Sequence, residues 1–378
     1  MRDEIARLAR PAVLAIKPYS SARRESPQED VTTFLDANEN PFPPYPGDDT
    51  CLDMNRYPMP QPPELVALFS AHYGVATEQL LVTRGADEAI DLLARVFCHE
   101  GRDAVIITPP TFPMYGMAAQ VQGAWTIEVP LLHEREGIHR DCGLDANAIR
   151  VACERPGAPK LVFICSPNNP TGGLLDGDVV LSLCDGLLGR ALVVVDEAYL
   201  DFCGQPSMST RLPEHPNLVV LRTLSKGYSL AGERCGITLA HPDVIELMSR
   251  ILAPYPIPRS VITTVLRAMT SGGVTSARHH IFEMVAERAA LAAHLELLEG
   301  PVRGIFRSDA NFVLVELADP RLLLTMMAAR NIKIRDRSPA GGIEGCVRIS
   351  VGTPDQNVVV RDVFSAYADR AIRAASTC

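Results

Sequence analysis

The sequence of 378 residues lacks several patterns that would assign it to a class at once. Its ten cysteines contain no Cys-x-x-Cys pair and its nine histidines no His-Glu-x-x-His motif, so we expect neither a metal ion nor a thioredoxin-type redox site. Charged residues form no block of one sign, although the formal net charge is −9. The basic patch that is typical of nucleic-acid-binding proteins is therefore missing, and we expect no nucleic acid partner.

Long apolar runs are also absent. No stretch approaches the ~20 apolar residues that a membrane-spanning helix needs, and the N-terminus has no apolar signal core. Several cysteines lie within short apolar runs, where free cysteine packs as a small hydrophobic residue. Reduced cysteines without an export signal predict a cytoplasmic protein that does not bind membranes.

What the chain does have is an ordinary globular composition, with 47% apolar and 21% charged residues. Apolar strands are expected at 80–83, 104–108, 125–129, 161–165, 191–195 and 218–221, with helical segments between most of them. Continuous Val, Ile and Leu strands that alternate with helices predict an α/β fold with a mostly parallel central sheet buried on both faces.

Two proline clusters, at 41–63 and 254–258, divide the chain, because proline is excluded from the interior of helices and sheets. Beyond them the pattern changes to helices at 259–271, 275–298, 320–330 and 355–373 and strands at 310–317 and 345–351. We predict a large domain of residues 41–253, a linker of residues 254–258, and a smaller α+β domain. The smaller domain would combine the N-terminal arm 1–40 with residues 259–378.

Three polar segments directly follow expected strands. They are residues 166–172 (Ser-Pro-Asn-Asn-Pro-Thr-Gly), 196–199 (Asp-Glu-Ala-Tyr) and 222–226 (Arg-Thr-Leu-Ser-Lys). Ligands of open α/β sheets bind beyond the carboxyl ends of the strands, so these segments are expected to meet in one crevice. Each alone has a simpler interpretation, such as a turn, a helix cap or a solvated lysine. Their order and common placement favour a binding site.

The residue types in these segments match the groups of pyridoxal phosphate. Lys226 can form a Schiff base, and Asp196 can pair with a protonated pyridine nitrogen. Asn169 and Tyr199 can hydrogen-bond the ring oxygen beside the imine. A phosphate can be held by hydroxyl groups, a guanidinium fork and a helix N-terminus, for which the candidates are Thr223, Ser225, Arg234, Gly85, Ala86 and Asp87.

The chain resembles the fold-type-I aminotransferases, and among them most closely the histidinol-phosphate aminotransferase family. The resemblance covers nearly the whole chain. Besides the segments above, it is carried by residues 17–24, 36–41, 55–58, 84–88, 334–336 and 345–352. It implies pyridoxal 5'-phosphate as cofactor, bound covalently to Lys226, which then moves the proton between substrate and cofactor. It also implies that Tyr115 stacks on the cofactor ring and that Tyr57 reaches in from the other subunit of a homodimer.

The resemblance implies an amino transfer between histidinol phosphate and 2-oxoglutarate that yields imidazole acetol phosphate and glutamate, a step of histidine biosynthesis. Arg348 would bind the carboxylate of glutamate, and the substrate phosphate would lie among Tyr19, Asn169, Arg335 and Arg348. Two arginines suit this double task, because a guanidinium fork matches both carboxylate and phosphate.

Some positions depart from the family pattern. Glu233 stands beside Arg234, where it either pairs with that arginine and weakens its hold on phosphate or points away. Three alternatives to the function remain open. They are an aminotransferase for aromatic amino acids, a lyase like threonine-phosphate decarboxylase, and a non-catalytic regulator, which the presence of Lys226 and the short proline-interrupted arm disfavour.

Overall fold

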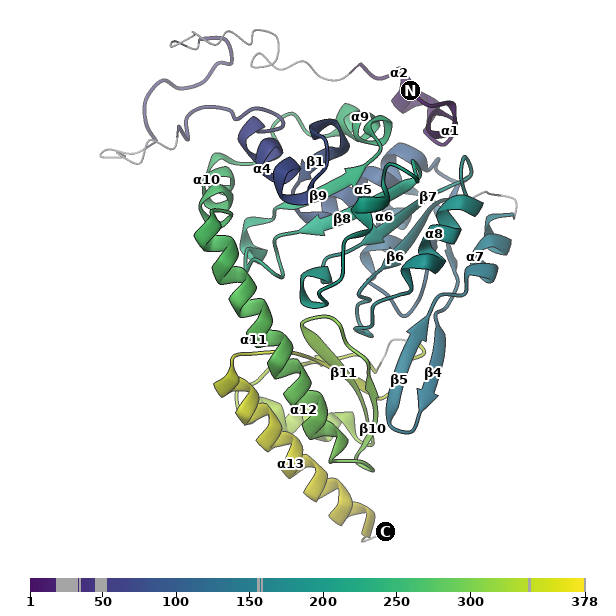
Figure 1. Cartoon of the computed structure of the whole chain (residues 1–378), viewed down its shortest axis with the longest axis vertical. Coiled ribbons are helices and arrows are strands. Elements are labelled where there is room, and N and C mark those ends of the chain that lie inside the picture. Colours follow the sequence, from purple (N-terminus) through teal and green to yellow (C-terminus); the bar gives the residue numbers. More distant parts are fainter. Residues whose placement is uncertain are drawn as a thin grey trace.

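A seven-stranded sheet forms one half of the molecule and a six-stranded sheet the other half (Figure 1). The computed structural model describes residues 1–17, 33, 35–44, 53–154, 157, 159–338 and 341–376. The first sheet has the order β1 (Leu80–Thr83), β9 (Gly236–Ala240), β8 (Leu218–Thr223), β7 (Leu192–Asp196), β6 (Pro159–Cys165), β2 (Ala104–Ile107) and β3 (Trp125–Glu128). From β8 to β3 all neighbours are parallel, so the prediction of a mostly parallel α/β sheet is confirmed. Strand β9, which the sequence did not reveal, is antiparallel to β8 and β1.

Alternation along the strands creates two apolar cores, one on each face of this sheet. In β8, Leu218 and Val220 belong to one core, whereas Val219 and Leu221 belong to the other, as the period of two of a strand requires. The first core is covered by α4 (Pro63–Tyr73), α7 (Ala146–Cys153), α8 (Gly177–Gly186) and α10 (Arg259–Ala268). The second core is covered by α5 (Gly85–Phe97), α6 (Met114–Gln122) and α9 (Pro242–Ile251). The sheet is thus buried on both faces.

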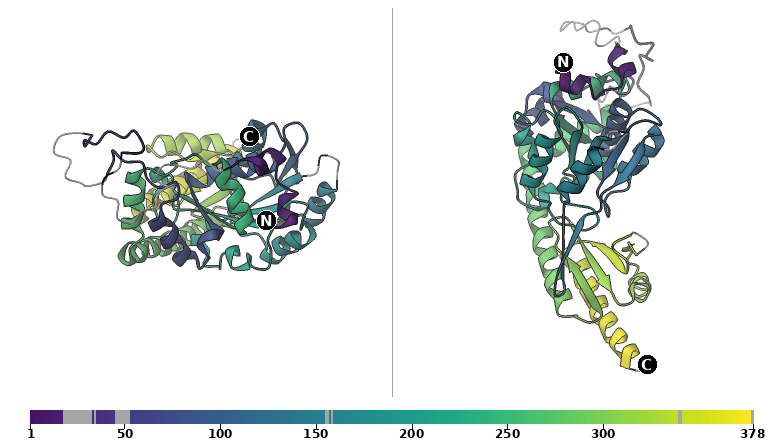
Figure 2. Two further views of the ribbon diagram at one scale, coloured as in Figure 1. Left: turned by 90° about the horizontal axis from the view of Figure 1, so that it is seen from above. Right: turned by 90° about the vertical axis from the view of Figure 1, so that its right-hand side faces the viewer.

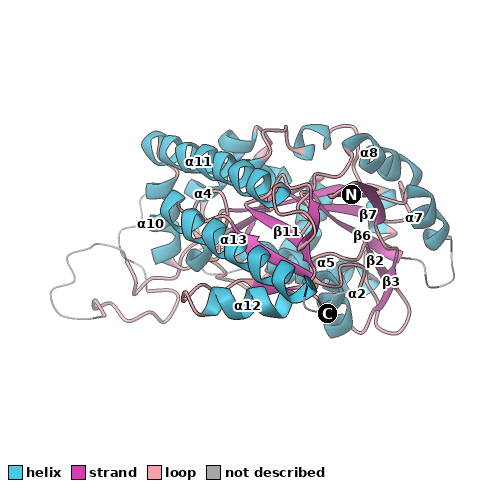
Figure 3. Ribbon diagram, turned by 90° about the horizontal axis from the view of Figure 1, so that it is seen from below, coloured by secondary structure: helices cyan, strands magenta, loops and turns pink. Residues whose placement is uncertain are grey.

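The second sheet has the order β12 (Arg335–Asp336), β13 (Cys346–Ser350), β11 (Phe312–Leu317), β10 (Val302–Phe306), β5 (His139–Gly143) and β4 (Leu132–Glu136). Its helices α11 (Ser271–Glu296), α12 (Pro320–Ala328) and α13 (Pro354–Ser376) lie side by side in the view from below (Figure 3). The right-hand view of Figure 2 shows the two sheets one above the other along the long axis, with α11 running past both.

Two segments lie elsewhere than the predicted domain boundaries imply. Residues 1–15 form α1 (Asp3–Ala6) and α2 (Pro11–Ala15), which bury Ile5 and Val13 in the core of the seven-stranded sheet, not against the smaller unit. Conversely, the β4–β5 hairpin falls within the expected large domain but pairs with β10 in the second sheet. In both cases a long-range apolar or strand-pairing contact decides the placement, which local sequence cannot reveal. The domain boundaries themselves stay a prediction.

Short helical turns complete the chain: η1 (Thr77–Gln79), η2 (Leu200–Phe202), η3 (Met208–Arg211) and η4 (Ala231–Glu233). Within the described residues, no helix is long and apolar enough to cross a membrane. The same residues contain no group of three or more potential metal ligands. The eight cysteines of the described part are unpaired thiols, and all except Cys203 are buried.

Candidate active site

The three polar segments meet at the carboxyl ends of β6, β7 and β8. The parallel register sets Cys165 opposite Asp196 and Asp196 opposite Leu221, so the segments that follow start at one edge of the sheet. They enclose a cavity of about 130 Å³. Its lining consists of Ala86, Asp87, Phe112, Cys165, Asn169, Asp196, Ala198, Tyr199, Thr223, Ser225, Lys226, Ala231 and Arg234. The structure therefore brings nine of the predicted cofactor-binding residues together.

The loop after β6 is held in place by Asn168, which is fully buried. Its Nδ2 donates to the carbonyl oxygen of Pro110 at 2.9 Å and to Oγ1 of Thr171 at 2.8 Å. Its Oδ1 accepts a hydrogen bond from Oγ1 of Thr111 at 3.1 Å. The neighbouring Asn169 is thereby fixed at the cavity wall, because the loop is tied both to itself and to the segment after β2.

Asp196 is a carboxylate that is only 3% exposed. Oδ2 accepts a hydrogen bond from the hydroxyl of Tyr115 at 2.7 Å, and Oδ1 accepts one from the backbone N–H of Ala198 at 3.1 Å. Burial raises the pKa of Asp196, and these two hydrogen bonds oppose the rise. A buried carboxylate is costly unless it is paired, so Asp196 suits a cationic group in the cavity.

Lys226 is half-buried at the end of the loop after β8, with Nζ 5.7 Å from the ring centroid of Tyr199. Burial lowers its pKa most, and the positive charges of Arg348 and Arg234 lower it further, against the opposing charges of Asp87 and Asp196. A lowered pKa favours the neutral amine, which is the nucleophile in Schiff-base formation.

One end of the cavity is built for a phosphate. Arg234 Nη1 donates to Ser225 Oγ at 3.3 Å, and Thr223 Oγ1 donates to the same oxygen at 2.9 Å. The first turn of α5 lies beside them, and its N-cap residue supplies no side-chain hydrogen bond. Free N–H groups, hydroxyls and a guanidinium together form an anion site. The carboxylate that contacts Arg234 belongs to Asp87, at 3.0 Å, so the pairing considered for Glu233 does not occur in this arrangement.

Glycine at the start of α5 permits this close approach. Gly85 has φ +74°, and a Cβ there would lie 2.6 Å from Nη2 of Arg234. On the adjacent strand, a Cβ at Gly236 would lie 2.4 Å from the carbonyl carbon of Gly85. Any larger side chain would push Arg234 or β9 away from the helix N-terminus.

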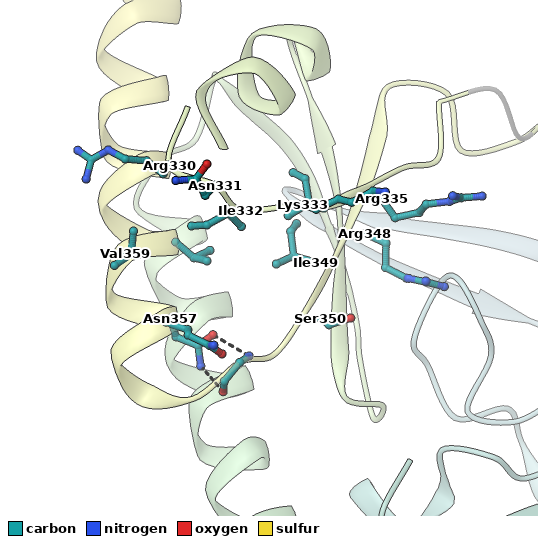
Figure 4. Close-up of a pocket in the computed structure, with 14 residues that line it drawn as sticks. Arg330, Asn331, Ile332, Lys333, Arg335, Arg348, Ile349, Ser350, Asn357 and Val359 are labelled. Atoms are coloured by element: carbon teal, nitrogen blue, oxygen red, sulfur yellow. Dashed lines mark hydrogen bonds between the residues drawn. The ribbon is translucent and has the colours of Figure 1, made fainter. Parts of the chain in front are cut away.

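The other end of the site carries Arg348 and Arg335. Nη1 of Arg348 donates to Oδ1 of Asn169, and Nδ2 of Asn169 donates to the hydroxyl of Tyr199 at 3.2 Å. Arg335 is opposite Arg348 in the antiparallel β12–β13 pair, and both side chains extend to the same side in Figure 4. The strands that carry them also line a separate cavity of about 510 Å³ beside α13, but in Figure 4 the two guanidinium groups extend away from its Asn357 and Val359. Burial, above all, and the charge of Arg335 lower the pKa of Arg348, because each disfavours its positive charge.

The prediction that Tyr115 stacks on the cofactor ring is wrong. Tyr115 is fully buried, lies outside the cavity and stacks on Phe163, with centroids 4.9 Å apart and an interplanar angle of 4°. Phe112 lines the cavity instead, and sequence reasoning missed it. The sequence alone does not separate these two aromatic residues: Phe112 closely follows the carboxyl end of β2, whereas Tyr115 lies inside α6, whose apolar face packs into the core.

Tyr57 and Gly85, which were also predicted at the cofactor site, do not line this cavity. Tyr57 is 47% exposed and stacks on Tyr255 at a centroid distance of 4.4 Å. Its expected role across a subunit boundary stays a prediction. Tyr19 lies outside the described residues. Sequence reasoning also missed Cys165, Ala198 and Ala231, three small residues that carry no chemical signal of their own.

These groups fit pyridoxal phosphate. The cavity offers a buried carboxylate whose hydrogen bonds come from a phenol and an amide, an amine with a lowered pKa, and a cluster of phosphate donors. Each corresponds to one functional group of that cofactor.

Comparison with known proteins agrees with this geometry. The family model described as aminotransferase class I and II matches residues 35–363. A histidinol-phosphate aminotransferase of Aeromonas hydrophila is 42% identical over 348 residues, which cover 92% of this chain and 94% of the relative. One of Stenotrophomonas maltophilia is 41% identical over 368 residues, with 96% and 97% covered. The crystal structure of histidinol-phosphate aminotransferase from Sinorhizobium meliloti in complex with pyridoxal-5'-phosphate has a TM-score of 0.72 at 23% identity. It covers 89% of this chain and 90% of that chain, and it has the same fold.

Proposed function

The chain belongs to the class I and II aminotransferase family, and from this we propose that it transfers an amino group between histidinol phosphate and 2-oxoglutarate. The products are imidazole acetol phosphate and glutamate, and the cofactor is pyridoxal 5'-phosphate. The observation that carries the proposal is that the charges of two arginines act on Lys226. Arg234 lies beside Ser225 at the phosphate end, and Arg348 donates a hydrogen bond to Asn169 in the cavity wall. The names of the relatives at about 40% identity support the same substrate.

When bound, the cofactor supplies an electron sink for the negative charge that develops at the substrate carbon. The residues of the cavity would hold and orient the cofactor. The first turn of α5, Ser225 and Arg234 would hold its phosphate, and Asp196 would accept a hydrogen bond from the ring nitrogen. Asn169 and Tyr199 would bind the ring oxygen, and Phe112 would cover the ring in place of Tyr115.

Lys226 has two tasks in this proposal. Its Nζ would hold the cofactor carbon, and as a free amine it would carry a proton between the substrate carbon and the cofactor. Both tasks need a neutral amine, and the lowered pKa of Lys226 favours that form. The guanidinium groups of Arg234 and Arg348 thus act twice, because Arg234 binds the cofactor phosphate, Arg348 binds substrate anions, and both disfavour protonation of Lys226.

Arg348 serves both substrates. Its guanidinium can form two parallel hydrogen bonds with the carboxylate of glutamate or with the phosphate of histidinol phosphate. Arg335 supplies a second charge on the neighbouring strand, which suits the doubly charged phosphate. Tyr19 and Asn169 complete the proposed phosphate site.

We propose that the enzyme works as a cytoplasmic homodimer with shared active sites. Tyr57 supports the dimer, because it is half-exposed and does not line the cavity of its own chain. Tyr57 of each chain would then reach the cofactor phosphate of the other. Sedimentation and a mixed-variant experiment test this arrangement. A Tyr57→Phe chain paired with a Lys226→Ala chain should regain one intact active site per dimer.

The decisive experiment is a substrate panel on the purified, cofactor-loaded chain. Histidinol phosphate, aromatic amino acids and threonine phosphate are offered separately, each with 2-oxoglutarate. We expect glutamate to form fastest with histidinol phosphate. Faster reaction with tyrosine or phenylalanine would assign an aromatic aminotransferase. Release of carbon dioxide from threonine phosphate without glutamate would assign a lyase.

A further inference from the structure

Among the described residues, Tyr115 alone donates a side-chain hydrogen bond to Asp196, and it does so from outside the cavity lining. Its hydroxyl lies 2.7 Å from Oδ2 of Asp196, while its ring is fully buried and outside the cavity lining. The backbone N–H of Ala198 binds the other carboxylate oxygen at 3.1 Å. Two donors therefore hold the carboxylate, one on each oxygen.

As a hydrogen-bond donor, the hydroxyl of Tyr115 stabilises the ionised form of Asp196. Burial raises the pKa of Tyr115 well above its ordinary value, so the hydroxyl keeps its proton and donates a hydrogen bond to the carboxylate. Without such donors, the buried Asp196 would tend to take up a proton and lose its attraction for a cation. Tyr115 thus favours the ionised form of Asp196.

The ring of Tyr115 fixes the position of that hydroxyl. It stacks on Phe163 of β6 with an interplanar angle of 4°, and it meets the edge of Phe112 with centroids 5.7 Å apart. Phe112 itself lines the cavity. One side chain therefore contacts both the group that would pair with the ring nitrogen and the group that would cover the ring face.

We propose that Tyr115 is a positioning residue of the cofactor site, which orients the Asp196 carboxylate toward the pyridine nitrogen through its hydroxyl and supports Phe112 through its ring. The inference rests on the proposed use of pyridoxal phosphate. It assigns to Tyr115 a role different from the ring stacking expected from sequence.

The test compares two cofactors in the full-length chain freed of cofactor. One is pyridoxal phosphate, and the other is its analogue with carbon in place of the pyridine nitrogen. Tyr115→Phe removes only the hydroxyl and retains the stacked ring. Because a hydrogen bond to a charged group is involved and each tenfold in affinity corresponds to 1.4 kcal/mol, we expect the Kd for pyridoxal phosphate to rise about tenfold. The Kd for the analogue should change less than about twofold, since it has no ring nitrogen for Asp196 to bind.

Tyr367→Phe is the matched control. Tyr367 is also fully buried, and its hydroxyl is bonded to the backbone of Pro301 and Asp319, in the core of the second sheet. Tyr367→Phe should leave the Kd values for pyridoxal phosphate and for the analogue unchanged. If Tyr115→Phe folds poorly, Phe163→Leu loosens the same ring and leaves the groups on Asp196 intact. Phe163→Leu should raise the Kd for pyridoxal phosphate less than Tyr115→Phe does, and it should likewise leave the Kd for the analogue nearly unchanged.

The outcomes distinguish the proposed function of the chain from the positioning role of Tyr115. Failure of the unaltered chain to bind pyridoxal phosphate would refute the proposed function. Normal binding by the unaltered chain, with an equal Kd in Tyr115→Phe, would refute the positioning role alone. An equal loss of affinity for both cofactors would also refute it, because a merely structural defect does not distinguish a nitrogen from a carbon.

Discussion

The two ends of the candidate site are built in different ways. The cofactor end lies at the carboxyl ends of buried parallel strands and encloses about 130 Å³, and short loops fix Asn169, Asp196 and Ser225 by hydrogen bonds. The substrate end carries Arg348, which donates a hydrogen bond to Asn169, and Arg335, which is exposed on a strand of only two residues. A rigid end suits one resident group, whereas an open end with forked cations suits two substrates of different shape.

The largest expected effect is at the rigid end. Among the described residues, Lys226 is the only amine in the cavity lining, so for Lys226→Ala we expect loss of the visible absorbance of the bound cofactor and a decrease in kcat of at least about 10³-fold. Lys160 lies in β6, and Lys160→Ala is the control, which should retain the visible absorbance and the unaltered kcat. Covalent cofactor retained in Lys226→Ala would contradict the assignment.

At the open end, Arg348→Ala should slow both half-reactions by about 10²-fold, because truncating one partner of a buried charge pair costs about 2–5 kcal/mol. Single-turnover absorbance measurements with glutamate and with histidinol phosphate separate the two. Arg335→Ala should affect histidinol phosphate more than glutamate. A normal glutamate half-reaction in Arg348→Ala would remove this residue from the proposed site.

The rigidity of the phosphate cradle can be tested at Gly85. Gly85→Ala adds a Cβ 2.6 Å from Arg234 Nη2 at φ +74°, so we expect weaker cofactor binding by about tenfold and a loss of about 1–3 kcal/mol in unfolding free energy. Gly101→Ala is a matched control. It has φ +64° but nothing within 4 Å of its Cβ, so it should share the backbone strain and leave cofactor affinity unchanged. Equal affinity losses in both variants would show that the contact with Arg234 is irrelevant.

The smallest effect links the two ends. The positive charge of Arg348 contributes to the lowered pKa of Lys226, after burial. Arg348→Gln removes that charge, which favours the protonated amine, so the pKa of Lys226 should rise. Capture of cofactor by the neutral amine should then require a higher pH, and its rate profile should shift in the alkaline direction. Arg335→Gln is the comparison. An unshifted profile in Arg348→Gln would mean that the two ends are electrostatically independent.

Much of the cofactor end could be predicted because the motifs stand where parallel strands stop. Strand-end placement of residues 166–172, 196–199 and 222–226 follows from apolar runs alone, and the structure brings them into one cavity. The choice between Phe112 and Tyr115 could not be made in the same way. Both are aromatic and three residues apart, and only the packing of α6 against β6 shows which one faces the core.

The sequence by itself determined the alternation of strands and helices, the residue types at the strand ends and the chemistry that they can perform. These are local properties, set by the period of apolar residues and by the functional groups of single side chains. The tertiary structure decided the pairing of β4–β5 with β10, the docking of residues 1–15 on the first sheet and the hydrogen bond from Tyr115 to Asp196. Each of these depends on contacts between segments distant in the chain, where burial and strand pairing outweigh local preference.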